Sequence, residues 1–245
     1  MKCLFTLILT ICSLTGFGQE QAKSILEKVD LNMSANSRVF ESTMTINGKR
    51  NSRSITSRSY VVGSQKSFTE YLSPPREQGT KMLKLEEQLW IYSPSTDRTI
   101  QISGHMLRQS VMGSDLSYED MMEDRKLTEI YNSKITGQEL IGQRKTWVLE
   151  LTAKTDDIAY ATRKLWVDTE RYIPLKEELY AKSGKLLKQS VMSDVERVGG
   201  RWFPKTIFYK DMLKQGSEGT EFKITKIQFD TEIPEHLFTK AALKL

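Results

Sequence analysis

The chain has 245 residues, 38% of them hydrophobic and 27% charged, with a formal net charge of +5. One domain of this length can bury about 70% of the surface that its unfolded chain exposes. The 36 basic and 31 acidic residues are mixed along the whole sequence, a balance that excludes the concentrated basic surface of a nucleic-acid-binding protein.

The first 18 residues have the composition of a cleavable secretory signal peptide. Lys2 precedes an apolar run from Leu4 to Ile11, and small and polar residues follow up to Gly18. The apolar run is too short for a membrane-spanning helix, which needs about 20 predominantly apolar residues. We therefore predict cleavage after Gly18, a single mature domain over residues 19–245, and a periplasmic location.

Both cysteines of the chain, Cys3 and Cys12, lie within this predicted leader. A mature domain would then contain no disulfide, no thiol nucleophile and no thiolate metal site. The segment before Cys12 distantly resembles the motif that precedes lipidated cysteines in bacteria. Ile11 stands where that motif has a small residue, which argues against a lipoprotein tethered to the membrane through Cys12.

Hydrophobic periodicity after the leader predicts one helix and many strands. Apolar residues from Ala22 to Met33 recur at helical spacing, which predicts an amphipathic helix over residues 20–34 that packs across a sheet. Beyond it the dominant period is two, as expected for strands with one buried face. The strands are predicted near residues 38–46, 53–62, 65–72, 80–85, 88–93, 98–102, 130–140, 146–153, 161–168, 173–181, 185–195, 202–210 and 221–229.

Turn signals between these strands predict antiparallel pairing. Asn47-Gly48 can adopt the positive φ angles of a tight hairpin, and Ser183-Gly184 can do the same. No alternation of strands and helices indicates a parallel sheet. Because strand twist accumulates, we expect a mainly β (α+β) fold in which a strongly curved antiparallel sheet forms an incomplete β-barrel.

An insertion over residues 103–125 interrupts the strands. We expect its short helix, for which Ser117 is a plausible N-cap, and the N-terminal helix to cover the concave face of the sheet. Methionine side chains repack easily around ligands of variable shape, so the insertion could be a mobile apolar lid. The alternative, that the methionines of the insertion fill an irregular core under a loop, stays open. The insertion contains four methionines, Met106, Met112, Met121 and Met122.

The sequence offers little catalytic chemistry. Its two histidines, His105 and His236, stand in unrelated contexts. It has no nucleophile elbow, zinc-protease helix, phosphate-binding glycine loop or dinucleotide fingerprint. A Ser-His-Asp arrangement around His105 is compatible with the composition, but no motif supports it. We predict a protein that is not an enzyme and that needs no cofactor.

Two charged clusters have simple electrostatic explanations. The acidic cluster over residues 115–124 could supply oxygen ligands to calcium, but it lacks the alternating ligands and the glycine of a calcium loop. Carboxylates at a helix start favour the helix dipole, so we predict no metal site. The basic cluster over residues 49–58 is interpreted as a solvated sheet edge, with contact to anionic lipid head groups as the alternative.

Several short motifs resemble one known family. The first half contributes Pro75, Gly79-Thr80, Leu89–Pro94, Arg98 and Met112–Asp120. The second half contributes Leu165–Asp168, Pro174, Gly184-Lys185, Trp202–Pro204 and Ile233–Thr239. Together they resemble the LolA-like outer-membrane lipoprotein-sorting protein family over essentially the whole mature chain. The string from Gly113 to Asp120 is the most specific, and it departs from the family only at Leu116, where the family has phenylalanine.

The resemblance implies an unclosed, strongly curved antiparallel barrel with helices on its concave side. It also implies a periplasmic role in carrying or holding lipids or lipid-modified proteins, with lipid or acylated protein as cargo. An inner-membrane transporter and an outer-membrane acceptor are the implied partners, and no catalytic residue is transferred. The alternative is a non-catalytic accessory module that docks on an envelope transporter or complex and whose cavity is filled by its own side chains.

Candidate cargo contacts are apolar side chains on the predicted strands or in the insertion. Tryptophans on strands are more often part of a core than of a binding site, and that alternative stays open for each of them. The candidates are Trp90, Tyr92, Met106, Leu107, Met112, Met121, Met122, Trp147, Leu149 and Trp166.

Overall fold

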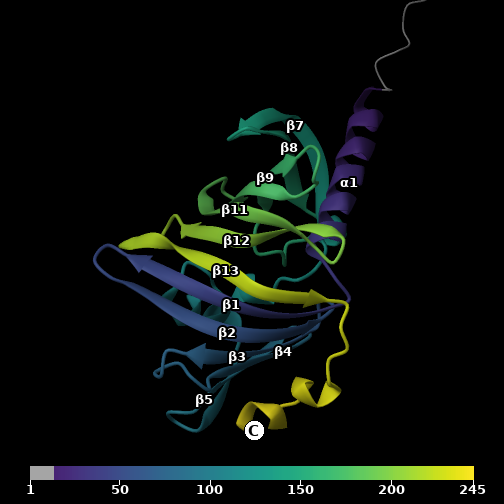
Figure 1. The fold of residues 1–245 in the computed structure, drawn as a ribbon. Coiled ribbons are helices and arrows are strands. Elements are labelled where there is room, and N and C mark those ends of the chain that lie inside the picture. The colour runs from purple at the N-terminus through teal and green to yellow at the C-terminus, as the bar shows by residue number, and fades with distance from the viewer. Residues whose placement is uncertain (1–13) are drawn as a thin grey trace, which may run out of the picture.

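One antiparallel sheet dominates the protein (Figure 1). The computed structural model describes residues 14–245. Its thirteen strands follow the order β6-β5-β4-β3-β2-β1-β13-β12-β11-β10-β9-β8-β7. β6 and β7 are the two edges and do not pair with each other, so the curved sheet stays open, as predicted. Residues 1–13, with Cys3 and Cys12, lie outside the described part, and the signal peptide stays a prediction.

All thirteen predicted runs coincide with observed strands. The strands are β1 (Ser37–Gly48), β2 (Ser52–Val62), β3 (Lys66–Ser73), β4 (Lys81–Leu85), β5 (Gln88–Ser93), β6 (Arg98–Ile102), β7 (Tyr131–Ile141), β8 (Arg144–Ala153), β9 (Thr162–Asp168), β10 (Pro174–Tyr180), β11 (Leu186–Val198), β12 (Arg201–Asp211) and β13 (Ser217–Phe229). The helices are α1 (Leu14–Met33), η1 (Gly104–Arg108), η2 (Val111–Gly113), α2 (Tyr118–Met122), α3 (Leu127–Ile130), η3 (Glu235–Phe238) and η4 (Ala241–Lys244).

The path of the chain places the insertion across the concave face. The first six strands run outward from β1 to β6, and the last seven run from β7 back to β13, which pairs with β1. The connection from β6 to β7 must therefore join the two far edges of the sheet. It carries η1, η2, α2 and α3, and it packs on inward-facing residues of β1 to β6.

Helix α1 packs on the concave side of the β7–β9 region. Its apolar face is buried against strand residues such as Leu149 and Val167, and Figure 1 shows α1 lying beside these strands. The helix starts at Leu14, six residues before the predicted start, and ends at Met33. None of the helices within residues 14–245 combines the length and apolar character that crossing a membrane requires.

One predicted hairpin closes differently from the expectation. Asn47 and Gly48 are the last residues of β1, and neither has a positive φ angle. The Gly48 N–H instead donates to the Asn51 carbonyl at 3.0 Å, so that the turn lies over residues 49–50. The prediction of positive φ at Asn47-Gly48 was wrong because the two strands continue to pair as far as Asn47 and Ser52, so the turn lies beyond Asn47-Gly48. Gly184 does have a positive φ of 78°, as predicted.

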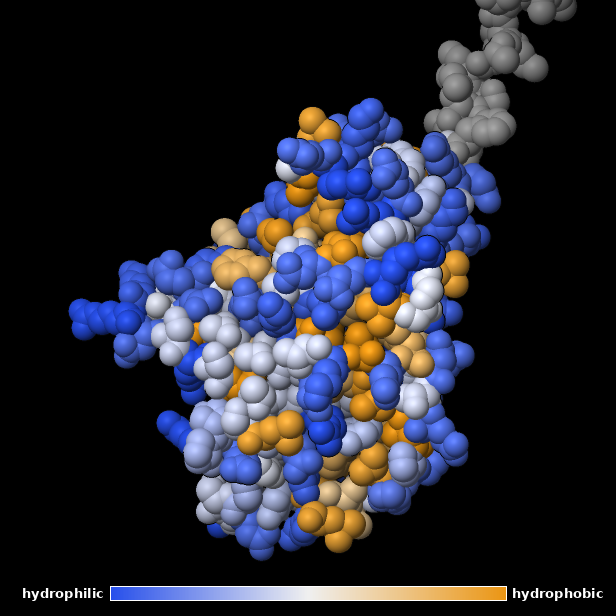
Figure 2. All heavy atoms as spheres, in the orientation of Figure 1, coloured by the Kyte–Doolittle hydropathy of each residue, from blue (hydrophilic) through white to orange (hydrophobic). Residues whose placement is uncertain are grey.

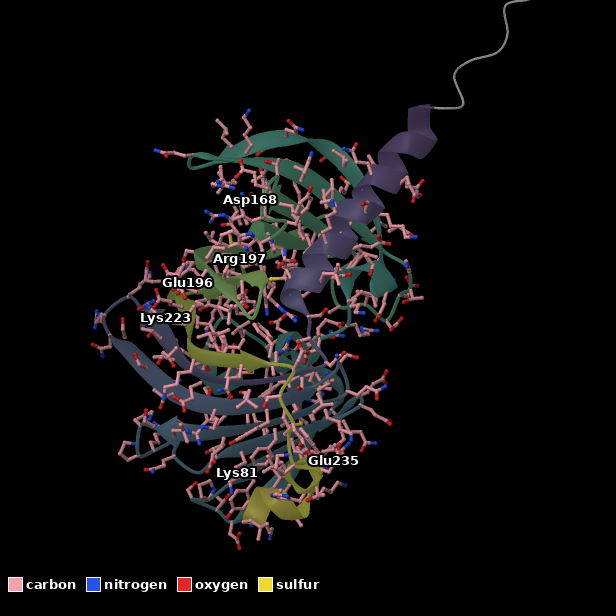
Figure 3. All side chains as sticks on the ribbon, turned by 45° about the vertical axis from the view of Figure 1, so that its right-hand side comes forward. Lys81, Asp168, Glu196, Arg197, Lys223 and Glu235 are labelled. Carbon is pink, nitrogen blue, oxygen red and sulfur yellow. The ribbon has the colours of Figure 1, made fainter. Side chains whose placement is uncertain are left out.

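The outer face of the sheet carries a second, smaller core. The C-terminal helices η3 and η4 pack there on residues of β3 to β5, and they bury Phe68, Leu83 and Trp90. Elsewhere charged side chains such as Glu196, Arg197 and Lys223 project from β11 and β13 into solvent (Figure 3). Figure 2 shows a largely hydrophilic surface in this view, with hydrophobic side chains in patches through its middle and right.

Helix α1 offers a matched test of its packing. Leu26 is 1% exposed and Leu31 on the same helix is 71% exposed. We expect Leu26→Ala to lower the free energy of unfolding by about 2–5 kcal/mol, because it leaves a cavity in the core. Leu31→Ala should change it by no more than about 0.5 kcal/mol. Urea denaturation of both variants checks this, and equal losses would contradict the buried face assigned to α1.

Candidate functional site

A cavity of about 370 Å³ lies between the concave face of the sheet and the β6–β7 connection. Part of its apolar wall comes from the three central strands of the sheet, β1, β12 and β13. The side chains that these strands contribute are Phe40, Phe203, Ile207, Tyr209, Phe222, Ile224 and Ile227. Ligand sites for small molecules typically have volumes of roughly 300–1,000 Å³, so the cavity is large enough for part of an extended apolar ligand.

The roof of the cavity is a short segment, residues 117–126, which we call the cover. It contains α2, whose N-terminus has a capping box: the Asp120 N–H donates to the Ser117 hydroxyl at 3.2 Å, and the Ser117 N–H donates to the Asp120 carboxylate at 2.7 Å. The predicted N-cap role of Ser117 is confirmed. Met121 and Met122 of the cover line the cavity and also pack on the neighbouring hydrophobic core.

A buried carboxylate anchors the chain just before the cover. Asp115 is fully buried and accepts hydrogen bonds from the Asp211 N–H at 3.0 Å, the Ser217 hydroxyl at 2.7 Å and the Thr220 hydroxyl at 2.7 Å. Asp211 is the last residue of β12, and Ser217 and Thr220 belong to β13. Asp115, the first aspartate of the motif from Gly113 to Asp120, therefore joins the insertion to the centre of the sheet.

A second carboxylate anchors the chain just after the cover. Asp30 of α1 accepts from the Leu127 N–H at 2.9 Å, the Thr128 N–H at 3.0 Å and the Thr128 hydroxyl at 2.6 Å. It satisfies the free N–H groups at the start of α3, as a capping side chain does. The cover is thus attached at both of its ends, through Asp115 before it and Asp30 after it.

Between these anchors, Asp120 joins the cover to the far side of the sheet. It forms an ion pair with Lys188 of β11 and accepts a hydrogen bond from the Tyr160 hydroxyl at 2.5 Å. Burial alone would raise the pKa of Asp120, but Lys188, Tyr160 and Ser117 together hold it below its usual value. Burial and the adjacent carboxylate raise the pKa of Tyr160.

Asp124 joins the other end of the cover to β1 and β4. It pairs with Arg38 and lies 3.8 Å from the Lys84 ammonium. Lys84 also donates to the Ser64 carbonyl at 2.6 Å and to the Met122 carbonyl. Burial lowers the pKa of Lys84, and Asp124 opposes that shift. Between its two anchors the cover is therefore joined to the sheet by charge pairs at two points, Asp120 and Asp124.

A further ion pair forms a polar wall of the cavity on β9 and β10. Arg163 lies 3.1 Å from Glu177 and donates to the Tyr131 hydroxyl at 2.8 Å. Burial alone would lower the pKa of Arg163, but Glu177 and Tyr131 raise it above its ordinary value. The cavity thus combines an apolar wall with charged groups that are already paired.

The structure disperses the predicted cargo contacts. Met121 and Met122 line the cavity. Met106, Leu107 and Met112 pack on the neighbouring core under η1 and η2. The insertion therefore supplies both a cavity roof and core filling, the two alternatives that the sequence left open.

The other five candidates lie on the sheet away from the cavity lining. Leu149 is fully buried beneath α1, and Trp147 stacks on Tyr172 in the same cluster, with ring centroids 5.6 Å apart. Trp90 and Tyr92 pack under the C-terminal helices on the outer face. Trp166 is also buried, and its indole N–H donates to Glu139 at 2.6 Å. Their predicted role in cargo binding has no support from this arrangement.

Sequence reasoning missed the central apolar wall. Phe222 and Ile224 alternate with polar neighbours along β13, so their burial was predictable. Which buried residues border a space depends on the curvature of the sheet and on the height of the cover, and neither has a sequence period.

The acidic cluster of the sequence does not converge on one point. Asp115 accepts from backbone and hydroxyl donors, Asp120 and Asp124 face lysine and arginine, and Glu123 pairs with Arg125. Within residues 14–245 no group of three or more His, Cys, Asp or Glu side chains is placed to hold a metal ion.

The two histidines lie apart. His105 is exposed on η1, and His236 lies on η3 at the outer face.

Comparisons with known proteins agree with this architecture. A protein-family model described as an uncharacterized protein matches residues 63–245. No curated protein matches the chain. Among solved structures, a LolA superfamily protein from Nitrosomonas europaea is 26% identical, with a TM-score of 0.76 over 90% of this chain and 98% of that chain.

Two further solved structures share the fold at lower identity. An outer-membrane lipoprotein-sorting protein domain from Vibrio parahaemolyticus is 23% identical, with a TM-score of 0.80 over 93% of this chain and 100% of that chain. A DUF1329 family protein from Desulfovibrio piger is 22% identical, with a TM-score of 0.83 over 92% of this chain and 99% of that chain. These likenesses span nearly the whole chain.

The Asp115 anchor predicts a large stability loss on truncation. We expect Asp115→Ala to lower the free energy of unfolding by about 3 kcal/mol or more, because each abandoned buried donor costs roughly 1–3 kcal/mol. Asp156→Ala is the control, since Asp156 pairs only with the exposed Lys182 and should change stability by no more than about 0.5 kcal/mol. Chemical denaturation measures the free energy of unfolding of both variants. A loss for Asp115→Ala as small as that of the control would contradict the anchoring role of Asp115.

The lowered pKa of Asp120 predicts a pH-dependent contribution to stability. The folded pKa lies below the unfolded value of about 3.9, so the stabilisation is present above that value and is lost as the pH falls through the folded pKa. Asp120→Asn should therefore be less stable than the wild type at neutral pH, and the difference should shrink as the pH falls below about 4. Thermal unfolding across this range measures it, and a pH-independent difference would refute the assigned pairing.

Proposed function

We propose that the chain, which shares its fold with a LolA superfamily protein and an outer-membrane lipoprotein-sorting protein domain, is a periplasmic carrier or binding protein for lipids or lipid-modified proteins. Acyl chains occupy the cavity between the central strands and the cover. The observation that carries the proposal is the apolar wall of a cavity of about 370 Å³ under a cover held by charge pairs.

The physics of acyl binding supports this use of the cavity. Each methylene group that leaves water gains about 0.8 kcal/mol, so a long acyl chain needs an apolar host to cross an aqueous compartment. The wall that includes Phe203, Phe222 and Ile224 supplies apolar contacts. Met121 and Met122 can repack around chains of different shape because methionine is unbranched and flexible.

The attachment of the cover suits reversible opening. The cover is held to the sheet through side-chain ion pairs at Asp120 and Asp124, while its two ends stay fixed by Asp115 and Asp30. Ion pairs gain little net free energy when their desolvation is counted. A ligand that replaces their contacts can therefore lift the cover without unfolding the sheet.

The proposal includes export and partners. The leader over residues 1–18 would direct the chain to the periplasm, without a tether at Cys12. An inner-membrane transporter would supply lipid or acylated protein, and an outer-membrane acceptor would receive it. Binding and release need neither a catalytic group nor a cofactor.

The accessory-module alternative requires a cavity filled by the protein's own side chains. A cavity of about 370 Å³ between sheet and cover supports the carrier instead. An accessory module would also retain its activity when the cavity is made polar, which gives the two proposals different outcomes in one experiment.

Two adjacent residues of β11 provide that experiment. Met192 lines the cavity, whereas Val191 is exposed on the opposite face of the same strand. We expect Met192→Glu to weaken binding of a fluorescent fatty acid at least about tenfold, equivalent to about 1.4 kcal/mol, because a carboxylate in the cavity costs desolvation. Val191→Glu should bind like the wild type.

Fluorescence titration of both variants, with circular dichroism to verify folding, measures the difference. Unchanged binding by a folded Met192→Glu variant would place the acyl chain elsewhere and overturn the proposed function.

A further inference from the structure

We propose that the ligand is an anionic amphiphile whose acidic head group replaces the carboxylates of the cover on the cations of the concave sheet. The inference rests on the proposed function and adds the chemical class of the ligand. In this closed structure the cover acts as an internal substitute for the head group.

The charges on the two sides of the cavity differ in net sign. The strand residues that line it include four cations and one carboxylate, a net charge of +3, and the cover contributes four carboxylates and two cations, Arg125 and Lys126, a net charge of −2. The strand cations are Arg38, Lys84, Arg163 and Lys188. The cover carboxylates are Glu119, Asp120, Glu123 and Asp124. When the cover lifts, the concave surface of the sheet gains a net positive charge.

The pairing at Arg38 and Lys84 shows the substitution most clearly. The Lys84 side chain is 5% exposed and the Asp124 side chain is 15% exposed. Asp124 is the carboxylate that both cations face. If the cover opened without a replacement anion, a buried ammonium would lose its counter-charge, which is strongly destabilising. An arriving carboxylate or phosphate would restore it.

The pairing at Lys188 repeats this arrangement on the other side of the cavity. Lys188 and Asp120 have side chains that are 12% and 11% exposed. Tyr160 donates to the same carboxylate, and an anion in its place would receive the same donor. Two cationic points thus flank the apolar wall, so an acidic head group can be bound while its chain lies on that wall.

The head group has a polar space beside the first of these points. A hollow of about 490 Å³ lies next to the cavity, and its lining includes three cations, Arg38, Lys126 and Arg201, and three carboxylates, Asp124, Glu129 and Asp230. Arg38 and Asp124 line both spaces. Their ion pair therefore stands between an apolar compartment and a polar one, where an amphiphile changes from chain to head group.

Three probes test the inference on the full mature chain. 1-Oleoyl lysophosphatidic acid and 1-oleoylglycerol have the same chain and differ only in the phosphate, and inorganic phosphate has no chain. By isothermal titration calorimetry we expect the lysophosphatidic acid to bind at least about tenfold more tightly than the glyceride. Inorganic phosphate should not compete at equal concentration, because it gains no apolar burial.

Charge variants separate head-group recognition from general damage. Lys84→Met keeps the length and apolar stem of the side chain, and it should weaken binding of the lysophosphatidic acid about tenfold more than it weakens binding of the glyceride. Arg38→Gln is a second, more exposed variant with the same expected effect. Asp124→Asn removes the competing carboxylate and should tighten binding of the lysophosphatidic acid. If Asp124 had only a structural role, the substitution would instead weaken binding of both lipids.

The outcomes distinguish this inference from the proposed function. Equal binding of both lipids would overturn the anionic preference and leave the carrier intact. Binding of inorganic phosphate as tightly as the lysophosphatidic acid would identify a free-phosphate site and overturn the amphiphile. Binding of neither lipid would overturn the inference together with the carrier.

Discussion

The pairing of β13 with β1 is the constraint on which the rest of the structure depends. It joins the first and last strands at the centre of the sheet and leaves β6 and β7 as distant edges. The chain between those edges has no path along the sheet, so it crosses the concave side and becomes the roof of a cavity. Curvature supplies the hollow and topology supplies its cover. Asp115 and Asp30 then fix the two ends of the cover, and between them side chains join the cover to the sheet.

Charge pairs hold the cover together with the apolar packing of Tyr118, Met121 and Met122 on the neighbouring core. Asp120 and Asp124 of the cover pair with Lys188, Arg38 and Lys84 of the strands that line the cavity. Such pairs give specificity of position with little net free energy, since desolvation offsets much of their attraction. A cover of this kind keeps one position on the sheet, and a ligand can still replace the contacts that it makes there. The same pairs explain why the cavity can remain partly empty under a closed roof.

The sequence predicted the fold far better than it predicted the cavity. The thirteen strands were recognisable because each has a period of two bounded by turn residues, and the helix because Ala22 to Met33 has helical spacing. The lining depends instead on which face of a curved sheet each residue takes and how near the roof lies. Trp90 and Trp166 are large, apolar and on strands, yet they face outward, under the C-terminal helices and beside Glu139 respectively. Met121 and Met122 were identified because the insertion stood out from the strand pattern. The anchoring role of Asp115 was hidden because its partners are about one hundred residues away.

Native mass spectrometry of the mature protein, purified from its own envelope, tests the central claim most directly. The account predicts a fraction of molecules that retain one acyl-bearing ligand, which lipid extraction then identifies. An unliganded mass, from a protein that also refuses added lipids and acylated peptides, would contradict a carrier with an acyl-binding cavity.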